Sequence, residues 1–311
     1  KVVCACGNGT AGAFAPEALR RMGVAVVVEV DCKLDWTFPR YNPNPEDTVM
    51  LHAMAEAVRQ HDADLALGFD GDGDRCGVVD DEGEEIFADK IGLMLARDLS
   101  GLHRDATFVV DVKSTGLFAT DAVLKANGAK TVYWKTGHSY IKRKTAELGA
   151  LAGFEKSGHF FFNPPIGRGY DDGIVAAAAI LSMLDRNPGK KLSDLKKALP
   201  VAYTSLTMSP HVADEVKYGL VDDVVAEYTA LRDAGGTILG RKIAELITVN
   251  GVRVALEDGS WVLVRASSNK PEIVVVVEST QSEDDMRRLF REEVKPRLAK
   301  RPEVGAYNQE I

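Results

Sequence analysis

Apolar runs alternate with amphipathic segments along the first two thirds of the chain. Residues 2–27 contain an apolar strand, a glycine-rich turn, a helix with Pro16 near its first turn, a stop at Gly23 and a second strand. The same order returns in residues 108–134, where Gly128 takes the place of Gly23. This pattern predicts strand-helix-strand units, which are typical of an α/β fold.

The repeat continues beyond these units. Residues 64–75 and 151–160 each run through apolar positions to Gly-Phe and then enter a polar loop that begins with an acid. An acidic residue and a helical pattern follow each loop. Because a repeated pattern indicates a repeated fold, the two polar loops should occupy equivalent places. Ligands of such sheets bind at the carboxyl ends of strands, so both loops are predicted to face a shared cleft.

The pattern changes in the last third of the chain. A helical pattern covers residues 218–234, closely spaced strands follow between residues 247 and 279, and a charged helix comes last. Gly251 and the Asp258-Gly259 turn fit hairpin connections between those strands. We expect two repeated mixed α/β domains followed by a smaller α+β domain, at residues 1–101, 102–205 and 206–311.

Composition narrows the class of protein. A chain of 311 residues, 45% hydrophobic and 27% charged, is typical of a globular protein of several domains. The net charge of −8, with no long basic run, argues against a nucleic-acid binder. No apolar stretch approaches the roughly 20 residues that span a bilayer, and no signal peptide opens the chain, so we expect a cytoplasmic protein without a membrane segment.

The four cysteines show no spacing typical of zinc ligands, and we expect them to be reduced. Cys4 and Cys6 lie two residues apart in an apolar run, so on a strand they share one face. Core packing is the simplest role for both thiols. The other two cysteines are Cys32 and Cys76.

The loop Asp70-Gly71-Asp72-Gly73-Asp74-Arg75 carries the strongest chemical signal. Carboxylates held about 4 Å apart repel by roughly 4 kcal/mol per pair at an effective dielectric near 20, so the loop needs a cation unless it is a solvated acidic turn. Oxygen ligands separated by glycines favour Mg²⁺. A calcium EF-hand is excluded because it requires glycine where Arg75 stands and helices on both sides.

Two further loops combine groups suited to a phosphosugar. Glu155, Ser157 and His159 offer an acceptor, a hydroxyl and an imidazole within five residues, a set that can bind vicinal sugar hydroxyls. Residues 265–271 place cations, hydroxyls, an amide and backbone N–H groups between two apolar strands, which is how a phosphate dianion is held without a metal. Taken alone, either loop is also typical of a polar surface turn.

Together these loops resemble those of the α-D-phosphohexomutase superfamily, and most nearly its bacterial phosphomannomutase/phosphoglucomutase group. The family's Asp-Gly-Asp-x-Asp-Arg and Glu-x-Ser-Gly-His motifs are present at 70–75 and 155–159. Its Arg-x-Ser-Asn-Thr-x-Pro loop is matched less fully at 265–271, with Ser268 where asparagine is usual and Asn269 where threonine is usual. The motifs occur in the family's order, covering its second, third and fourth domains.

The resemblance implies a mutase that moves a phosphoryl group between hexose 1-phosphate and hexose 6-phosphate through a 1,6-bisphosphate, with mannose or glucose as the sugar. It implies Mg²⁺ as cofactor, a phosphosugar as partner, and a monomer or dimer. The implied metal ligands are Asp70, Asp72 and Asp74. Implied catalytic residues are Arg75, Lys113, His138 and His159, although His138 alone would pass for a structural histidine. Implied substrate-binding residues are Glu155, Ser157, His159, Arg265, Ser267, Ser268 and Asn269.

The family's first domain, with a phosphoserine in a Ser-His-Asn loop, has no counterpart in this sequence. The chain also opens directly on a predicted strand. We therefore expect that a further domain precedes these residues in the complete protein, and that the 311-residue chain binds ligands without turning them over.

Three alternative functions stay open at this point. Gly7, Gly9 and Gly12 satisfy the dinucleotide-binding spacing after a strand, with Glu29 and Asp31 about 20 residues on, which would indicate an oxidoreductase. That motif explains none of the other loops, and glycines in such a turn serve close packing equally well. The others are a phosphoglucosamine mutase and a non-catalytic phosphosugar-binding protein.

Overall fold

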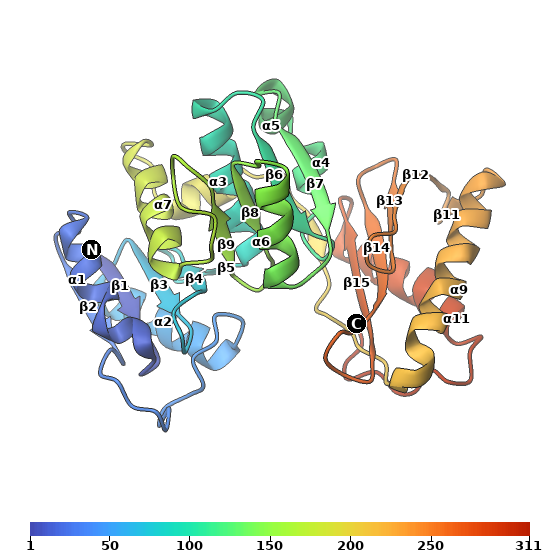
Figure 1. The fold of residues 1–311 in the computed structure, drawn as a ribbon, viewed down its shortest axis with the longest axis horizontal. Coiled ribbons are helices and arrows are strands. Elements are labelled where there is room, and N and C mark those ends of the chain that lie inside the picture. The colour runs from blue at the N-terminus through green and yellow to red at the C-terminus, as the bar shows by residue number, and fades with distance from the viewer. The chain divides into compact units, whose positions relative to one another are not determined.

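The computed structural model describes residues 1–311 (Figure 1). The chain forms two compact units. Unit 1 comprises Lys1–Asp111, Ala122–Val132 and Gly137–Leu199, and unit 2 comprises Val112–Asp121, Tyr133–Thr136 and Pro200–Ile311. None of the helices combines the length and the apolar composition that crossing a membrane requires.

The first sheet has five strands in the order β2-β1-β3-β4-β5. Strand β1 pairs in parallel with β2 and β3, and β3 pairs antiparallel with β4 so that Phe69 lies opposite Cys76. The strands are β1 Val2–Ala5, β2 Val27–Val30, β3 Leu65–Phe69, β4 Cys76–Val79 and β5 Glu85–Ile86. The helices of this region are a 3₁₀ turn at Thr10–Ala13, α1 Ala15–Arg21, α2 Thr48–His61 and α3 Ala88–Leu102.

Helix α2 covers one face of this sheet because its apolar residues recur at helical spacing. Met50, Met54 and Val58 are buried and share a core with Val3 and Ala5 of β1. Alternate residues of β1 therefore point toward α2, and the intervening Cys4 points to the opposite face. Both faces of β1 are covered, which explains why the strand reads as a continuous apolar run.

The second sheet repeats the topology of the first. Its order is β7-β6-β8-β9, which matches β2-β1-β3-β4 strand for strand. Strand β6 pairs in parallel with β8, and β8 pairs antiparallel with β9. The strands are β6 Thr107–Asp111, β7 Lys130–Trp134, β8 Ala152–Phe154 and β9 Phe160–Phe162. The helices are α4 Leu117–Thr120, α5 Ala122–Ala126, α6 His138–Glu147, α7 Gly173–Asp185 and α8 Leu192–Lys197.

The predicted α/β class and the predicted repeat are both confirmed. Pro16 lies in the first turn of α1, and Gly23 and Gly128 adopt positive φ angles of 98° and 73° after α1 and α5. Glycine is the residue that reaches such angles without strain, so it ends the helix in both copies. The two predicted loops occupy equivalent connections, β3 to β4 and β8 to β9.

The third sheet belongs to unit 2 and has the order β10-β15-β14-β13-β12-β11. Gly251 and Gly259 have φ angles of 69° and 88° at turns between antiparallel strands, as the predicted hairpins require. The strands are β10 Tyr203–Thr204, β11 Thr237–Ile238, β12 Arg241–Ile247, β13 Val252–Leu256, β14 Trp261–Ala266 and β15 Ile273–Ser279. The helices are α9 Asp214–Asp233, α10 Glu283–Arg288, a π-helical stretch Leu289–Val294 and α11 Lys295–Leu298.

The two faces of the third sheet have different partners. One face, which includes Val254 and Val264, packs on α9 and the C-terminal helices, as the ribbon of unit 2 also shows (Figure 1). The alternate residues of the same strands point to the other face, because side chains alternate along a strand. These alternate residues include the buried Arg253, Trp261 and Glu278.

The second face of the third sheet holds the segment that follows β6. The Arg253 guanidinium donates through Nη1 to the carbonyls of Val112 and Ser114, at 2.6 and 2.7 Å. It also lies 3.7 Å from the centroid of the Trp261 ring. Glu278 accepts from the Trp261 indole at 2.8 Å. A buried charged cluster therefore fixes the backbone on either side of Lys113.

Candidate metal and phosphosugar site

Asp70 shapes the predicted metal loop. It directly follows β3, is 2% exposed, and its Oδ1 accepts from the backbone N–H groups of Gly73 and Arg75, both at 3.1 Å. Its Oδ2 accepts from Arg75 Nε at 2.6 Å. The loop thus turns back on its first residue, and the Arg75 guanidinium, which also donates to Asn44 Oδ1 at 3.0 Å, neutralises part of its charge.

The three loop carboxylates converge. Ligand oxygens of Asp70, Asp72 and Asp74 all lie within 4.8 Å of one another. Burial, and next the charges of Asp70 and Asp72, raise the pKa of Asp74 to about 7. Asp74 Oδ1 is buried without a hydrogen bond. Three converging carboxylates that repel one another, one of them with a buried oxygen that forms no hydrogen bond, fit a hard divalent cation such as Mg²⁺.

The loop that carries Glu155 and Ser157 is joined directly to the metal loop. Cys76 N donates to Gly158 O at 3.2 Å, and Arg75 and His159 form an antiparallel bridge. Glu155 is 5% exposed, and its backbone closes the turn by bonding to both Gly158 and His159. Ser157 Oγ is buried and forms no hydrogen bond. The hydrogen-bonding capacity of this hydroxyl is therefore unused within the chain.

His159 lies among carboxylates contributed by both halves of unit 1. Its Nδ1 is 3.0 Å from Asp171 Oδ2 and 3.5 Å from Asp74 Oδ1. His138 Nδ1 lies 3.4 Å from the same Asp171 oxygen, and the two imidazole rings stack with centroids 5.5 Å apart. Burial lowers the pKa of His159, which favours the neutral ring. Imidazoles that lie close to a carboxylate are suited to proton transfer.

The start of helix α7 brings Asp171 to this cluster. The Gly173 N–H donates to Gly73 O at 3.1 Å, and a Cβ on Gly173 would lie 2.7 Å from Arg75 O. Only glycine permits that close approach. Asp172 caps the helix by accepting from the N–H groups of the next turn. Asp171, one residue earlier, is then free to face the two histidines.

The predicted residues of unit 2 lie on two segments. Lys113 is half-buried, between the two carbonyls that Arg253 holds. Arg265 and Ser267 are buried at the end of β14, with exposures of 7% and 6%. The predicted donors at the exposed tip of the following turn are Ser268 and Asn269.

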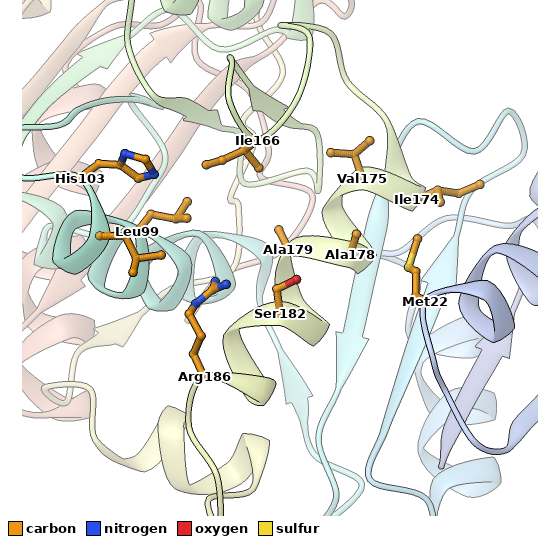
Figure 2. A pocket seen from close by; sticks show the side chains of 11 residues that line it. Met22, Leu99, His103, Ile166, Ile174, Val175, Ala178, Ala179, Ser182 and Arg186 are labelled. Carbon is orange, nitrogen blue, oxygen red and sulfur yellow. The ribbon is translucent and has the colours of Figure 1, made fainter.

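A separate apolar hollow of unit 1 contains none of the predicted site residues. It holds about 300 Å³ between α3, α7 and the end of α1 (Figure 2). Few polar side chains line it, and one of them, Arg186, forms an ion pair with Asp98. The hollow lacks the convergent donors and acceptors that a polar substrate needs.

Comparison with known proteins identifies the family. Three domain models of phosphoglucomutase/phosphomannomutase match in order: the alpha/beta/alpha domain II at residues 1–83, the alpha/beta/alpha domain III at 87–203 and the C-terminal domain at 212–295. The chain belongs to the phosphoglucomutase/phosphomannomutase family. The family resemblance seen in the sequence motifs is confirmed.

Several bacterial proteins are similar to this chain over most of its length. A phosphomannomutase/phosphoglucomutase of Pseudomonas putida is 35% identical over 289 residues, 93% of this chain and 58% of that protein. A phosphoglucomutase of Neisseria meningitidis is 34% identical, covering 90% of this chain and 57% of that protein. The structure of a phosphoglucomutase/phosphomannomutase family protein from Burkholderia thailandensis superposes with a TM-score of 0.84 at 30% identity, covering 98% of this chain and 61% of that one. The chain thus spans about 60% of the length of the relatives it matches.

Two contacts of this candidate site were not anticipated from sequence. Asp171 bridges both histidines, and Asn44 supports Arg75. The acid before α7 was visible in the repeat, but nothing local separates Asp171 from the capping Asp172. The glycine spacing of the dinucleotide alternative has a packing explanation, because a Cβ on Gly12 would lie 2.1 Å from Cys32 O.

Proposed function

We propose that this chain forms the cation-, sugar- and phosphate-binding part of a phosphohexomutase. The reaction interconverts hexose 1-phosphate and hexose 6-phosphate, with mannose or glucose as the sugar, through a hexose 1,6-bisphosphate. One observation carries the proposal: the loop with three converging carboxylates is hydrogen-bonded to the loop that holds Glu155, Ser157 and His159. A cation site and a set of hydroxyl-binding groups therefore adjoin within unit 1.

Each group of residues has a distinct part in the proposed reaction. Asp70, Asp72 and Asp74 would hold Mg²⁺, which when bound supplies positive charge to the phosphoryl group being transferred. Arg75 adds a fixed positive charge beside Asp70. Glu155 accepts hydrogen bonds from sugar hydroxyls, and Ser157 donates to them.

Proton transfer falls to the histidines. With the pKa of His159 lowered, the neutral ring can accept a proton from a sugar hydroxyl, and Asp171 stabilises the imidazolium that results. His138 shares that carboxylate and can take part in the same transfer. Lys113 contributes charge on the segment that Arg253 fixes. The non-reacting phosphate binds Arg265 and Ser267, with Ser268 and Asn269 as further donors.

Binding of ligands to the 311-residue chain tests the site. Isothermal titration with Mg²⁺, followed by glucose or mannose 1,6-bisphosphate, should show one cation site that strengthens bisphosphate binding. Asp72→Asn should weaken Mg²⁺ by about tenfold or more, because it removes the negative charge of one of three ligands. The matched control is Asp62→Asn, which makes the same charge change on an exposed residue before β3, at the opposite end of that strand from Asp70. Equal Mg²⁺ affinity in both variants would refute the assignment.

Turnover is measured on the full-length gene product. Mannose 1-phosphate and glucose 1-phosphate are assayed side by side with Mg²⁺ and a trace of hexose 1,6-bisphosphate. Conversion of both sugars, lost in Asp72→Asn and kept in Asp62→Asn, is the expected result. Glucosamine 1-phosphate is included because a Methanosarcina acetivorans relative, 30% identical, is named a probable phosphoglucosamine mutase. No conversion of any of the three sugars would contradict the proposed reaction.

A further inference from the structure

Three cysteine thiols meet at the edge of the first sheet. Cys4 lies in β1, Cys6 follows that strand, and Cys32 comes two residues after β2. The sulfurs of Cys4 and Cys6 are 3.7 Å apart, and those of Cys6 and Cys32 are 3.5 Å apart. All three sulfurs lie within 4.8 Å of one another. The parallel pairing of β1 with β2 brings Cys32 over the face that Cys4 and Cys6 share.

The spacing of the sulfurs fits a tetrahedral metal. Sulfurs bound to zinc at about 2.3 Å in tetrahedral geometry lie about 3.75 Å apart, which is 2.3 Å multiplied by 1.63. The two sulfur–sulfur distances, 3.5 and 3.7 Å, are close to that value. The ligand set contains sulfur alone, which selects soft ions over Mg²⁺ or Ca²⁺.

The three thiols differ in exposure. Cys32 is half-buried, whereas Cys4 and Cys6 are 0% exposed. An arriving ion therefore meets the Cys32 sulfur first. Each sulfur binds a metal as the thiolate rather than the thiol.

We propose that Cys4, Cys6 and Cys32 form a binding site for a soft divalent ion of the zinc and cadmium class. The ion takes three sulfur ligands and one solvent or small-molecule ligand on the side of Cys32. Binding releases the thiol protons to solvent, since each sulfur coordinates as the thiolate. The site shares no ligand with the carboxylates of the Asp70–Asp74 loop and is independent of the proposed mutase function.

Cadmium titration tests this site directly. The 311-residue chain is reduced with a phosphine, kept under nitrogen and titrated with Cd²⁺ in excess Mg²⁺, and the ultraviolet thiolate-to-cadmium charge-transfer band is recorded. Oxygen ligands give no such band, so Cd²⁺ bound at the carboxylate loop would not contribute to the signal. The band should saturate at one equivalent and persist against a chelator of micromolar affinity. Failure of the wild-type chain to saturate at one equivalent overturns the proposal, whatever the behaviour of any variant.

Variants assign the ligands. Cys32→Ser should weaken Cd²⁺ by more than the roughly 10–100-fold that loss of an outer-shell partner costs. The matched control is Cys76→Ala, which removes the one cysteine outside the cluster and should leave the band unchanged. Asp72→Asn should also leave it unchanged, which separates this site from the mutase site. An undiminished band in Cys32→Ser overturns the proposal.

Protection from alkylation gives a second measurement that needs no variant. Iodoacetamide should modify Cys32 first in the metal-free chain, because it is the most exposed thiol of the three. One equivalent of Cd²⁺ should slow that modification by at least tenfold, as read by mass spectrometry. An unchanged rate of modification at Cys32 overturns the proposal.

Discussion

Replacing Arg253 by methionine tests whether the buried cluster of unit 2 holds the segment on either side of Lys113. Arg253 is 2% exposed, donates two hydrogen bonds through Nη1 and lies between the rings of Trp261 and Tyr133, at 3.7 and 4.2 Å from their centroids. Methionine keeps much of the apolar stem and removes the guanidinium. The change therefore isolates the charged head group.

The expected loss follows from these contacts. We take about 1.5 kcal/mol for each of the two charge-assisted hydrogen bonds. This is the lower end of the usual range, chosen because one nitrogen makes both bonds. The stacked rings add about 2 kcal/mol for a desolvated cation. The variant no longer has to bury a charged group, and the methionine side chain packs in its place. These two effects offset the loss by about 2 kcal/mol. The net destabilisation is about 3 kcal/mol, which at a urea m-value of about 2 kcal/mol/M lowers the midpoint by about 1.5 M.

Urea unfolding followed by tryptophan emission measures this loss. The exposed Trp36 is replaced by phenylalanine in every sample to remove its signal. Emission then comes from Trp261, which is fully buried in the cluster, and from Trp134, which also belongs to unit 2. Arg287→Met is the control, because Arg287 forms an exposed i,i+4 pair with Glu283 and should change stability by less than about 0.5 kcal/mol. A loss below about 1 kcal/mol for Arg253→Met, or one equal to the control, would refute the reasoning.

Three other perturbations have defined outcomes. Gly12→Ala should lower thermal stability by about 2 kcal/mol or more, because its Cβ meets Cys32 O at 2.1 Å, whereas Gly101→Ala in helix α3, with nothing within 4 Å, should raise it slightly. Burial acts to raise the pKa of Asp258, but surrounding hydrogen-bond donors outweigh it and hold the pKa below its usual 3.8. Its contribution to stability is therefore present above pH 3.8 and lost as pH falls through the lowered value, so Asp258→Asn should flatten that part of the acid unfolding curve. Ser157→Ala should leave the melting temperature unchanged, since its hydroxyl forms no hydrogen bond, and weaken hexose 1,6-bisphosphate about tenfold in a binding titration.

The juxtaposition of the two loops of unit 1 could be predicted because it depends on topology. Each loop follows an apolar strand ending in Gly-Phe, and equivalent strands of a repeated fold end in equivalent places. The local chemistry of Asp70, Glu155 and Ser157 could also be predicted, because each of these residues belongs to a short sequence motif.

Contacts made by residues distant in sequence could not be predicted. Asp171 reaches the histidines because Gly173 lets the start of α7 pack closely against the metal loop. A single sequence does not show which loop the start of a helix will pack against. Cys32 joins Cys4 and Cys6 through the pairing of β1 and β2, although its spacing along the chain matches no familiar metal motif. Which atoms of Ser268 and Asn269 touch phosphate stays a prediction.

The shared strand order of the two sheets has an evolutionary consequence. If the two α/β halves of unit 1 arose by duplication, both would at first have carried the same loop sequence at this connection. Divergence then left acids in the β3–β4 loop and a Glu-Lys-Ser-Gly-His sequence in the β8–β9 loop, joined by the Arg75–His159 bridge. The two loops therefore carry different side chains at equivalent connections of the two sheets. Placing the same loop sequence at both connections would make the two halves more alike and would remove one of the two sets of side chains from the candidate site.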